Sequence, residues 1–391
     1  MSRIHWLGAG LSSLPGLRQL IAGDSHVVVW DQTIAKAQEA LGYRHSDMRV
    51  FSLGALTQAV SAGDIVVSML PNEWHVSVAK RCLGVGAHFL SCSYISPEMR
   101  ALDDAFTKAG LVSMNEIGLD PGIDHLMAHW LVADYQASPT FAARNEISFL
   151  SYCGGVPKFE NDFRYKFSWS PLGAFKALCA PSRSIRAYDE WRVERPWEAV
   201  SNYIAPLPIP ETFEVYPNRD SLPFMAAYKF DPSWRVKNFA RGTLRLNGWA
   251  AAWRDIFHDI GSLVETGDEA RLKDLSDVCW QKYGYEDGEP DRVVLCVGLT
   301  AVNNNQVVYD KAFTLDAWGD ERGSAMSRLV SGTVTIGVEA VLKGEVKPGV
   351  SAAPSKLPVV VSWINKVTDW AQHLAVVDLL TGDSSTCFGR T

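Results

Sequence analysis

The stretch from Met114 to His125 (MNEIGLDPGIDH) carries four ionisable side chains, two glycines and a proline between a strand-like segment and an amphipathic helical pattern. Pro121 fixes its own φ and biases Asp120 toward an extended backbone. Gly118 and Gly122 allow the backbone to approach other groups closely. Such a junction can hold carboxylates rigidly beside a ligand, so we predict that this stretch belongs to a functional site.

A simpler interpretation is that the stretch only starts a helix, with Asp120 as the N-cap and Pro121 at the first helical position. Capping by Asp120 explains neither Glu116 nor His125, which lie on either side of it. Glu116 and the neighbouring Asp124 could also cap helices or orient other groups. The sequence assigns His125 no role beyond such support.

A short glycine turn near the N-terminus indicates a dinucleotide-binding loop. Gly8-Ala9-Gly10 follows the first predicted strand and precedes a helical pattern that starts at Ser13. Glycines here allow a tight turn and a close approach to a pyrophosphate at the helix N-terminus. Because Ser13 stands where the usual third glycine would be, the loop could also be a plain strand-to-helix turn. The expected cofactor contacts are Gly8, Gly10, Leu11 and Ser12.

Asp31 ends the second predicted strand, about 20 residues beyond the turn, where a carboxylate accepts hydrogen bonds from ribose hydroxyls. A 2′-phosphate beside it would suffer like-charge repulsion, so we expect NAD rather than NADP. The alternative is that Asp31 only caps the helical pattern Thr33–Leu41. Met69, Leu70 and Ser91 end later strands at the carboxyl edge, where such sheets bind ligands, and are further expected cofactor contacts.

The elements that must position these residues alternate along the first third of the chain. Short β-rich apolar runs alternate with helical patterns, which predicts parallel βαβ units and a Rossmann-type α/β domain over residues 1–122. The predicted strands are Ile4–Leu7, His26–Trp30, Asp64–Met69, Ala87–Ser91 and Leu111–Met114. The predicted helices include Thr33–Leu41, Glu73–Leu83 and Pro97–Ala109.

From about Arg144 the pattern changes to strand-like runs between polar loops. It predicts an α+β domain with a mostly antiparallel or mixed sheet over residues 123–322 and a small helical insert at about 255–285. The helical run at 323–345 could return to the first domain. Residues 346–391 would form a C-terminal extension, with a strand at Pro358–Trp363 and a helix at Lys366–Leu380. The predicted strands of the second domain are Asn145–Tyr152, Phe213–Tyr216, Arg241–Leu246, Arg292–Leu299 and Gln306–Phe313.

The composition is that of an ordinary globular protein with a large core. The chain has 391 residues, 47% of them hydrophobic and 21% charged, with a formal net charge of −7. Its length predicts two domains, and its acidic balance argues against a nucleic-acid partner. The cysteines form no paired framework, and no export signal or membrane-length apolar run is visible. We therefore expect a cytoplasmic protein with no membrane attachment and no metal site.

Several blocks outside the first domain place arginines beside turn residues and aromatics. The guanidinium fork suits bidentate binding of carboxylates, although each arginine taken singly could form an ordinary salt bridge. Together, in their order along the chain, the blocks resemble the L-glutamate-forming saccharopine dehydrogenase (saccharopine reductase) family. The matching blocks are SYISP (93–97), NEIGLDPGIDH (115–125), SYCGG (151–155), YKFSWS (165–170), YPNRDS (216–221) and RGTLR (241–245).

The resemblance implies reversible oxidation of saccharopine by a nicotinamide dinucleotide, with glutamate and 2-aminoadipate 6-semialdehyde as products, in lysine metabolism. Arg219 and Arg241 would bind carboxylates of the substrate, and Ser170 would lie near the nicotinamide. The resemblance also implies a homodimer, with residues 123–322 as the saccharopine-binding and dimerisation domain. The implied substrate-binding residues are Ser93, Tyr94, Asp120, Gly154, Arg219, Arg241 and Thr243.

The chemistry needs proton transfer and orientation from the protein, since the cofactor carries the hydride. A positioned acid/base accelerates such transfers by roughly 10²–10⁴-fold. Asp120 is the first candidate, because its carboxylate can also stabilise a protonated imine. Tyr94 and Cys153 are weaker candidates, and Cys153 could instead be a small buried hydrophobe.

Two other functions are compatible with parts of the sequence. A carboxynorspermidine-type imine reductase would share the first domain and part of the DPG block, but should not need YPNRDS and RGTLR together. A non-catalytic dinucleotide-binding regulator would have no use for Tyr94, Asp120 and Cys153. NADP-using members of the family tend to carry a basic residue after the second strand. Trp30-Asp31-Gln32 stands there instead, which again favours NAD.

Overall fold

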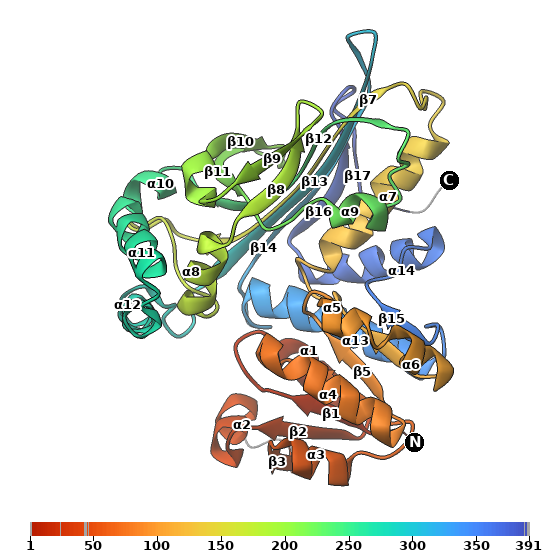
Figure 1. Ribbon diagram of the computed structural model, residues 1–391, viewed down its shortest axis with the longest axis vertical. Helices are drawn as coiled ribbons and strands as arrows, with labels where there is room; N and C mark the ends of the chain where they lie inside the picture. Colours follow the sequence, from red (N-terminus) through yellow and green to blue (C-terminus); the bar gives the residue numbers. More distant parts are fainter. Residues whose placement is uncertain (1, 24, 43–44, 46, 387, 389–391) are drawn as a thin grey trace. The chain divides into compact units, whose positions relative to one another are not determined.

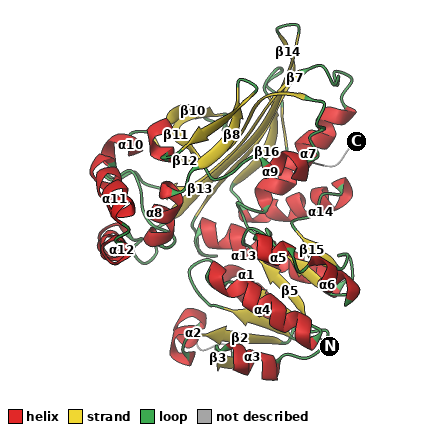
Figure 2. Ribbon diagram, viewed as in Figure 1, coloured by secondary structure: helices red, strands yellow, loops and turns green. Residues whose placement is uncertain are grey.

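The computed structural model describes residues 2–23, 25–42, 45, 47–386 and 388, and the chain divides into two compact units (Figure 1). Unit 1 contains residues 1–126 and 321–354, and unit 2 contains residues 127–320 and 355–391. Each unit is built on its own β-sheet (Figure 2). The predicted fold class is therefore confirmed. Which unit binds cofactor and which binds substrate stays a prediction.

Unit 1 is a seven-stranded, fully parallel sheet in the order β15-β6-β5-β4-β1-β2-β3. The strand order reverses between β1 and β4, and ligands of such sheets bind beyond the carboxyl ends at this reversal. Buried β-branched and aromatic residues form the strands, as expected for a sheet covered on both faces. The strands are β1 (Ile4–Leu7), β2 (Val27–Asp31), β3 (Met48–Val50), β4 (Ile65–Ser68), β5 (His88–Ser91), β6 (Val112–Met114) and β15 (Gly349–Ser351).

The helices of unit 1 connect these strands. The last of them, α13, is long and apolar enough by composition to cross a membrane, but 72% of it is buried inside the protein. Burial of this kind is typical of a core helix. The helices are α1 (Leu14–Ala22), α2 (Ile34–Leu41), α3 (Leu53–Ala59), α4 (Asn72–Val85), α5 (Pro97–Arg100), α6 (Asp103–Lys108) and α13 (Ala325–Leu342).

Unit 2 is built on a ten-stranded mixed sheet. Its main path is β10-β11-β12-β7-β13-β14-β16-β17, and the hairpin of β8 and β9 joins it at β12. Only β12 and β7, among the paired strands described, run parallel. The strands are β7 (Glu146–Pro157), β8 (Ser182–Arg186), β9 (Asp189–Val193), β10 (Ser201–Ala205), β11 (Glu211–Pro217), β12 (Arg235–Leu246), β13 (Asp291–Asn303), β14 (Gln306–Trp318), β16 (His373–Asp378) and β17 (Ser384–Ser385).

The helices of unit 2 include the predicted insert, which forms α11 and α12. Phe163, Trp249 and Trp253 belong to the buried aromatic cluster that these helices share with α8. The helices are α7 (Ile123–Ala137), which starts in unit 1, α8 (Pro171–Cys179), η1 (Pro196–Ala199), α9 (Pro223–Ala227), α10 (Trp249–Ala252), α11 (Arg254–Thr266), α12 (Glu269–Tyr283), α14 (Leu357–Val367) and η2 (Thr368–Trp370).

Two elements predicted in the C-terminal extension were wrong. The expected strand at Pro358–Trp363 lies in helix α14, and strand β16 lies inside the expected helix Lys366–Leu380. The extension is shared between the two units, because β15 pairs with β6 in unit 1 and β16 pairs with β14 in unit 2. Residues 387 and 389–391 of this extension lie outside the described residues.

Candidate active site

The glycine turn of unit 1 follows β1, where the order of the parallel sheet reverses. Gly8 has a φ of 93°, which favours glycine, and its N–H donates to the carbonyl oxygen of Trp30 at 2.7 Å. A Cβ at Gly8 would lie 3.2 Å from the carbonyl oxygen of Met69, while a Cβ at Gly10 would meet no described atom within 4 Å. The turn is thus tight on one side and open on the other. This geometry fits a pyrophosphate at the N-terminus of α1.

Gly16 packs closely against another helix. The sequence has Ser13 where the usual third glycine would be, and the role of Gly16 was not predicted. A Cβ at Gly16 would lie 2.4 Å from the carbonyl oxygen of Ser331 on α13. The N–H of Gly16 also donates to the Ser331 hydroxyl at 2.8 Å. The spacing GxGxxxxxG marks Gly16 in the sequence. Its packing partner, helix α13, comes from a distant part of the chain and could not be predicted from local spacing.

Asp31 holds the glycine turn against the end of β2. One carboxylate oxygen accepts from the N–H of Ala9 at 2.9 Å, and the other accepts from the N–H of Gln32 at 2.6 Å. A cation lies one helical turn further on, because the ammonium group of Lys36 donates to the Gln32 side chain at 2.9 Å. The carboxylate is therefore bound by backbone N–H groups of the glycine turn and of its own loop, and a basic side chain lies beyond it.

Tyr94 and Asp120, two of the predicted catalytic residues, lie together. The Tyr94 hydroxyl donates to Oδ1 of Asp120 at 3.0 Å. Both residues are partly accessible, whereas the rest of the 111–119 segment before Asp120 is buried. Their chain segments follow β5 and β6, which are neighbours in the sheet, so the parallel fold brings the two side chains to one edge. The pair can pass a proton or hold a charge at this edge.

Ser93, a predicted substrate-binding residue, contacts a buried histidine. Nε2 of His75 lies 2.9 Å from the Ser93 hydroxyl, and Nδ1 lies 3.0 Å from the Ser68 hydroxyl. Burial lowers the pKa of His75 to about 4, so the ring is neutral near pH 7. His75 was not predicted from the sequence, since its contacts depend on how α4 faces the sheet. Ser91 is buried, and its hydroxyl donates to the Asn115 side chain at 2.9 Å.

Glu116, His125 and Asp124 form a buried group next to the Tyr94–Asp120 pair in the chain. Nε2 of His125 lies 3.1 Å from Oε2 of Glu116, and Nδ1 lies 3.4 Å from Oδ2 of Asp124. Burial acts to raise the pKa of Glu116. The hydrogen bond and charge of His125, with the N–H of Ile95, outweigh that effect, and the pKa of Glu116 is lowered.

In unit 2, Arg241 and Thr243 lie on one face of β12, because side chains alternate along a strand. Arg241 is 4% exposed, and its guanidinium lies 4.1 Å from the ring centre of Phe224. The loop that carries Arg219 is fastened to the same strand, since the N–H of Asn218 donates to the carbonyl oxygen of Arg241 at 2.9 Å. Both predicted carboxylate-binding arginines thus belong to one corner of the mixed sheet.

Cys153 lies beside Thr243, because β7 and β12 pair in parallel with these two residues opposite each other. The thiol residue is 7% exposed, which also agrees with the alternative reading as a buried hydrophobe. Gly154 has a structural role that the sequence did not reveal. A Cβ there would lie 2.3 Å from the carbonyl oxygen of Leu244, so only glycine fits between the strands.

Arg245, on the same face as Arg241, was also missed. Its guanidinium is 6% exposed and lies 4.7 Å from the ring centre of Tyr165, 5.4 Å from that of Tyr216 and 5.5 Å from that of Trp249. It donates to the Tyr216 hydroxyl at 2.9 Å. The aromatic residues in the blocks YKFSWS and YPNRDS were the only features of the sequence that could have indicated this site. That they pack around one guanidinium depends on the register of the sheet, which the sequence does not show.

Ser170, the expected nicotinamide contact, caps α8 in the structure. Its hydroxyl accepts from the N–H of Gly173 at 3.3 Å. All of the predicted cofactor contacts stay predictions: Gly8, Gly10, Leu11, Ser12, Asp31, Met69, Leu70, Ser91 and Ser170.

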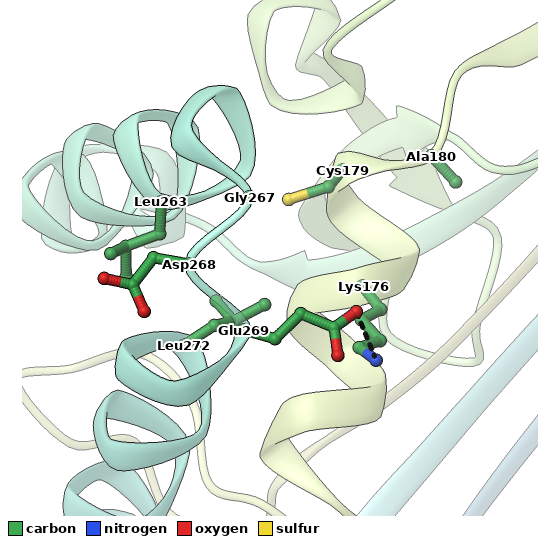
Figure 3. Close-up of a pocket in the computed structure, with 8 residues that line it drawn as sticks. All are labelled: Lys176, Cys179, Ala180, Leu263, Gly267, Asp268, Glu269 and Leu272. Atoms are coloured by element: carbon green, nitrogen blue, oxygen red, sulfur yellow. Dashed lines mark ion pairs between the residues drawn. The ribbon is translucent and has the colours of Figure 1, made fainter.

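A surface pocket of about 300 Å³ lies among α8, α11 and α12 (Figure 3). Leu263, Leu272 and Cys179 line it, and Lys176 pairs with Glu269 at 3.7 Å on its rim. None of the residues predicted from the sequence lines this pocket. Among the described residues, no cluster of three or more His, Cys, Asp or Glu side chains could hold a metal ion.

Two family models match consecutive parts of the chain. Residues 4–114 match the saccharopine dehydrogenase NADP binding domain, and residues 118–368 match the saccharopine dehydrogenase C-terminal domain. The chain belongs to the saccharopine dehydrogenase family.

Curated relatives and a solved structure that are similar to this chain are named L-glutamate-forming saccharopine dehydrogenase. The NADP(+), L-glutamate-forming saccharopine dehydrogenase of Schizosaccharomyces pombe is 32% identical over 301 residues, which cover 72% of this chain and 63% of that protein. The enzyme of the same name from Pyricularia oryzae is 36% identical over 272 residues, covering 66% and 57%. This family member thus spans about three-fifths of the length of the fungal relatives. The apo L-Glu-forming saccharopine dehydrogenase of Saccharomyces cerevisiae has a TM-score of 0.78 at 25% identity, covering 96% of this chain and 100% of that one.

The expectation of NAD was wrong. The matching N-terminal family model is an NADP binding domain, and the fungal relatives are named for NADP(+). Both oxygens of Asp31 accept backbone N–H groups, so its charge does not decide against a 2′-phosphate. A basic residue does follow the strand, but it is Lys36 on α2 and not the residue directly after Asp31.

Proposed function

We propose that this protein catalyses the reversible, NADP-linked oxidation of saccharopine to L-glutamate and 2-aminoadipate 6-semialdehyde, an oxidation of a CH–NH bond in lysine metabolism. The observation that carries the proposal is the Tyr94–Asp120 hydrogen bond of 3.0 Å at the edge of a parallel sheet, in a saccharopine dehydrogenase family member.

The residues of unit 1 fit an NADP molecule. The Gly8 turn would hold the pyrophosphate, and Lys36 would bind the 2′-phosphate, because its ammonium lies beside the residue that follows Asp31. When bound, NADP would supply the hydride acceptor for the substrate carbon. The protein's own task is then to orient saccharopine and to move protons.

Asp120 would perform the proton transfers that hydrolysis of the oxidised substrate requires. Its carboxylate can accept a proton from the attacking water, and its negative charge can stabilise a protonated imine nitrogen. Tyr94 orients that carboxylate through its hydroxyl. Ser93, held by His75, would donate to or accept from the substrate beside this pair.

Arg219 and Arg241 would bind carboxylates of saccharopine. Their place on one corner of the mixed sheet supports this role, as does the planar fork that matches a carboxylate. Thr243, Gly154 and Cys153 would border the same part of the substrate.

The test is to incubate purified protein with saccharopine and NADP and to follow the absorbance of reduced nicotinamide, with NAD and with carboxynorspermidine as comparisons. We expect turnover with saccharopine that is faster with NADP than with NAD. Turnover of carboxynorspermidine alone would replace the proposal by the sister activity. If neither substrate is turned over, the remaining hypothesis is a non-catalytic dinucleotide-binding regulator. A homodimer and a cytoplasmic location stay predictions, and sedimentation analysis tests the first.

A further inference from the structure

We propose that Glu116, His125 and Asp124 are positioning residues that hold Tyr94 and Asp120 at hydrogen-bonding distance. We call these three side chains the carboxylate–histidine clamp. The inference deepens the proposed function, since it gives a role in the same reaction to residues that a simple helix cap leaves unexplained.

One end of the clamp fastens the segment that carries Tyr94. Oε1 of Glu116 accepts from the N–H of Ile95 at 2.8 Å, directly after Tyr94. The N–H of Glu116 donates to the carbonyl oxygen of Ser93 at 3.1 Å, directly before it. Glu116 therefore grips this segment on both sides of Tyr94.

The other end fastens the turn that carries Asp120. Oδ1 of Asp124 accepts from the N–H of Gly122 at 2.7 Å. The N–H of Gly118 donates to the carbonyl oxygen of Pro121 at 2.9 Å, so the turn closes around Asp120. A Cβ at Gly122 would lie 2.1 Å from the carbonyl oxygen of Gly118, which leaves the turn no room for a larger residue.

His125 joins the two ends. Its ring nitrogens lie 3.1 Å from Glu116 and 3.4 Å from Asp124, and the three side chains are 3%, 11% and 0% exposed. The imidazole therefore lies between the two carboxylates and keeps them apart, and it contacts both ends of the clamp. Loss of the ring should let the two segments separate and break the Tyr94–Asp120 hydrogen bond.

The kinetic test compares His125→Gln with the matched control His5→Gln. His5 lies on β1, is 0% exposed and pairs with Asp64 at 3.2 Å, so its loss also removes a buried histidine–carboxylate contact. We expect His125→Gln to lower kcat by roughly 10- to 100-fold, as for a misplaced catalytic group, with little change in the KM for saccharopine. His5→Gln should keep the kcat of the wild type at saturating NADP. Equal kcat in folded His125→Gln and wild type would overturn the clamp.

A double variant separates positioning from simple destabilisation. In an Asp120→Asn background, the clamp has no catalytic carboxylate left to position. His125→Gln should therefore lower kcat no further, because groups that act as a unit are not additive. A full additional loss in the double variant would overturn the clamp.

Hydrogen exchange tests the clamp without any activity. In His125→Gln, peptides covering 93–97 and 118–124 should exchange faster together, by on the order of 10-fold, and in His5→Gln they should not. Coupled acceleration in a protein that does not turn over saccharopine would support the clamp and refute the proposed function. Unchanged exchange in both peptides would refute the clamp whatever the activity. Should His125→Gln not fold, Asp124→Asn, which keeps an acceptor for Gly122, takes its place in both measurements.

Discussion

Asp120 differs from the two carboxylates that flank it in sequence. Glu116 and Asp124 are buried, and each accepts a backbone N–H and faces His125. Asp120 is partly accessible and bonds to a tyrosine hydroxyl. At the scale of the residue, similar carboxylates thus have different surroundings, and the different roles that we propose for them rest on this difference.

Replacing Asp120 by Asn should lower kcat by roughly 10²–10⁴-fold, because the amide cannot take up a proton. The affinity for NADP, measured by quenching of protein fluorescence, should not change. Tyr94→Phe should have a smaller effect, since it removes only the orienting hydrogen bond. Normal turnover by Asp120→Asn would remove its acid/base role.

Replacing Arg241 by Ala should weaken saccharopine binding by about 1.5–3 kcal/mol, the range for hydrogen bonds to charged groups. Titration calorimetry in the presence of NADP measures this change. Arg241→Lys should retain part of the affinity, because the charge remains while the fork is lost. Arg219→Ala should give a loss of similar size, and unchanged affinity in both alanine variants would mean that other groups hold the carboxylates.

His75 makes stability depend on pH. Its pKa in the folded protein is about 4, below the value of 6.5 expected when it is unfolded, so the unfolded chain binds the proton more readily. The folded state is then fully favoured above pH 6.5 and loses about 3 kcal/mol as the pH falls to 4. His75→Gln should show a shallower fall in urea-unfolding free energy over this window.

At the scale of the element, the contact between α1 and α13 leaves no space for a methyl group at Gly16. Gly16→Ala should destabilise the protein by about 1–3 kcal/mol, because the added carbon meets backbone rather than a movable side chain. Gly54→Ala is the matched control. It lies within α3, no described atom lies within 4 Å of its new Cβ, and it should stabilise by about 0.5–1 kcal/mol. Thermal unfolding of both variants gives the comparison, and a stable Gly16→Ala would mean that the helices separate easily.

Sequence patterns predicted the elements whose period is clear and failed where composition and period conflict. Five of the seven parallel strands of unit 1, namely β1, β2, β4, β5 and β6, are short, buried and β-rich, and they appear close to their expected places, whereas β3 and β15 were not predicted. Pro358–Trp363 is rich in valine, which favours a strand. However, Val360, Trp363, Ile364 and Val367 are buried at helical spacing, and Pro358 lies in the first helical turn. Tertiary burial of that face decides for a helix. The hairpin of β8 and β9 was missed because its residues are polar and partly exposed.

The candidate site, like the fold, could be predicted from the sequence only in part. Tyr94 and Asp120 follow neighbouring strands of a regular sheet, so their meeting can be expected from the strand order. The contacts of His75 and Arg245 depend on helix rotation and on the register of a mixed sheet, and neither is encoded in local spacing.

At the scale of the whole molecule, cofactor binding should raise stability. NADP at a hundredfold excess over its Kd adds about 2.7 kcal/mol, or roughly 5–10 °C in Tm for a domain of this size. The shift should be larger with NADP than with NAD. Lys36→Ala should reduce the shift with NADP and leave the shift with NAD. An equal or larger shift with NAD would contradict the role of Lys36.

The interrupted chain of unit 1 has a consequence for how the protein is made and cut. The ribosome synthesises α13 and β15 only after all of β7 to β14. Until then β6 lacks β15, its neighbour at the edge of the sheet, and the Gly16 side of α1 lacks the α13 helix that covers it. In a fragment that ends at residue 126, the edge of β6 and the Gly16 side of α1 would stay exposed permanently. Expression of unit 1 by itself should therefore succeed only when residues 321–354 are joined to residues 1–126.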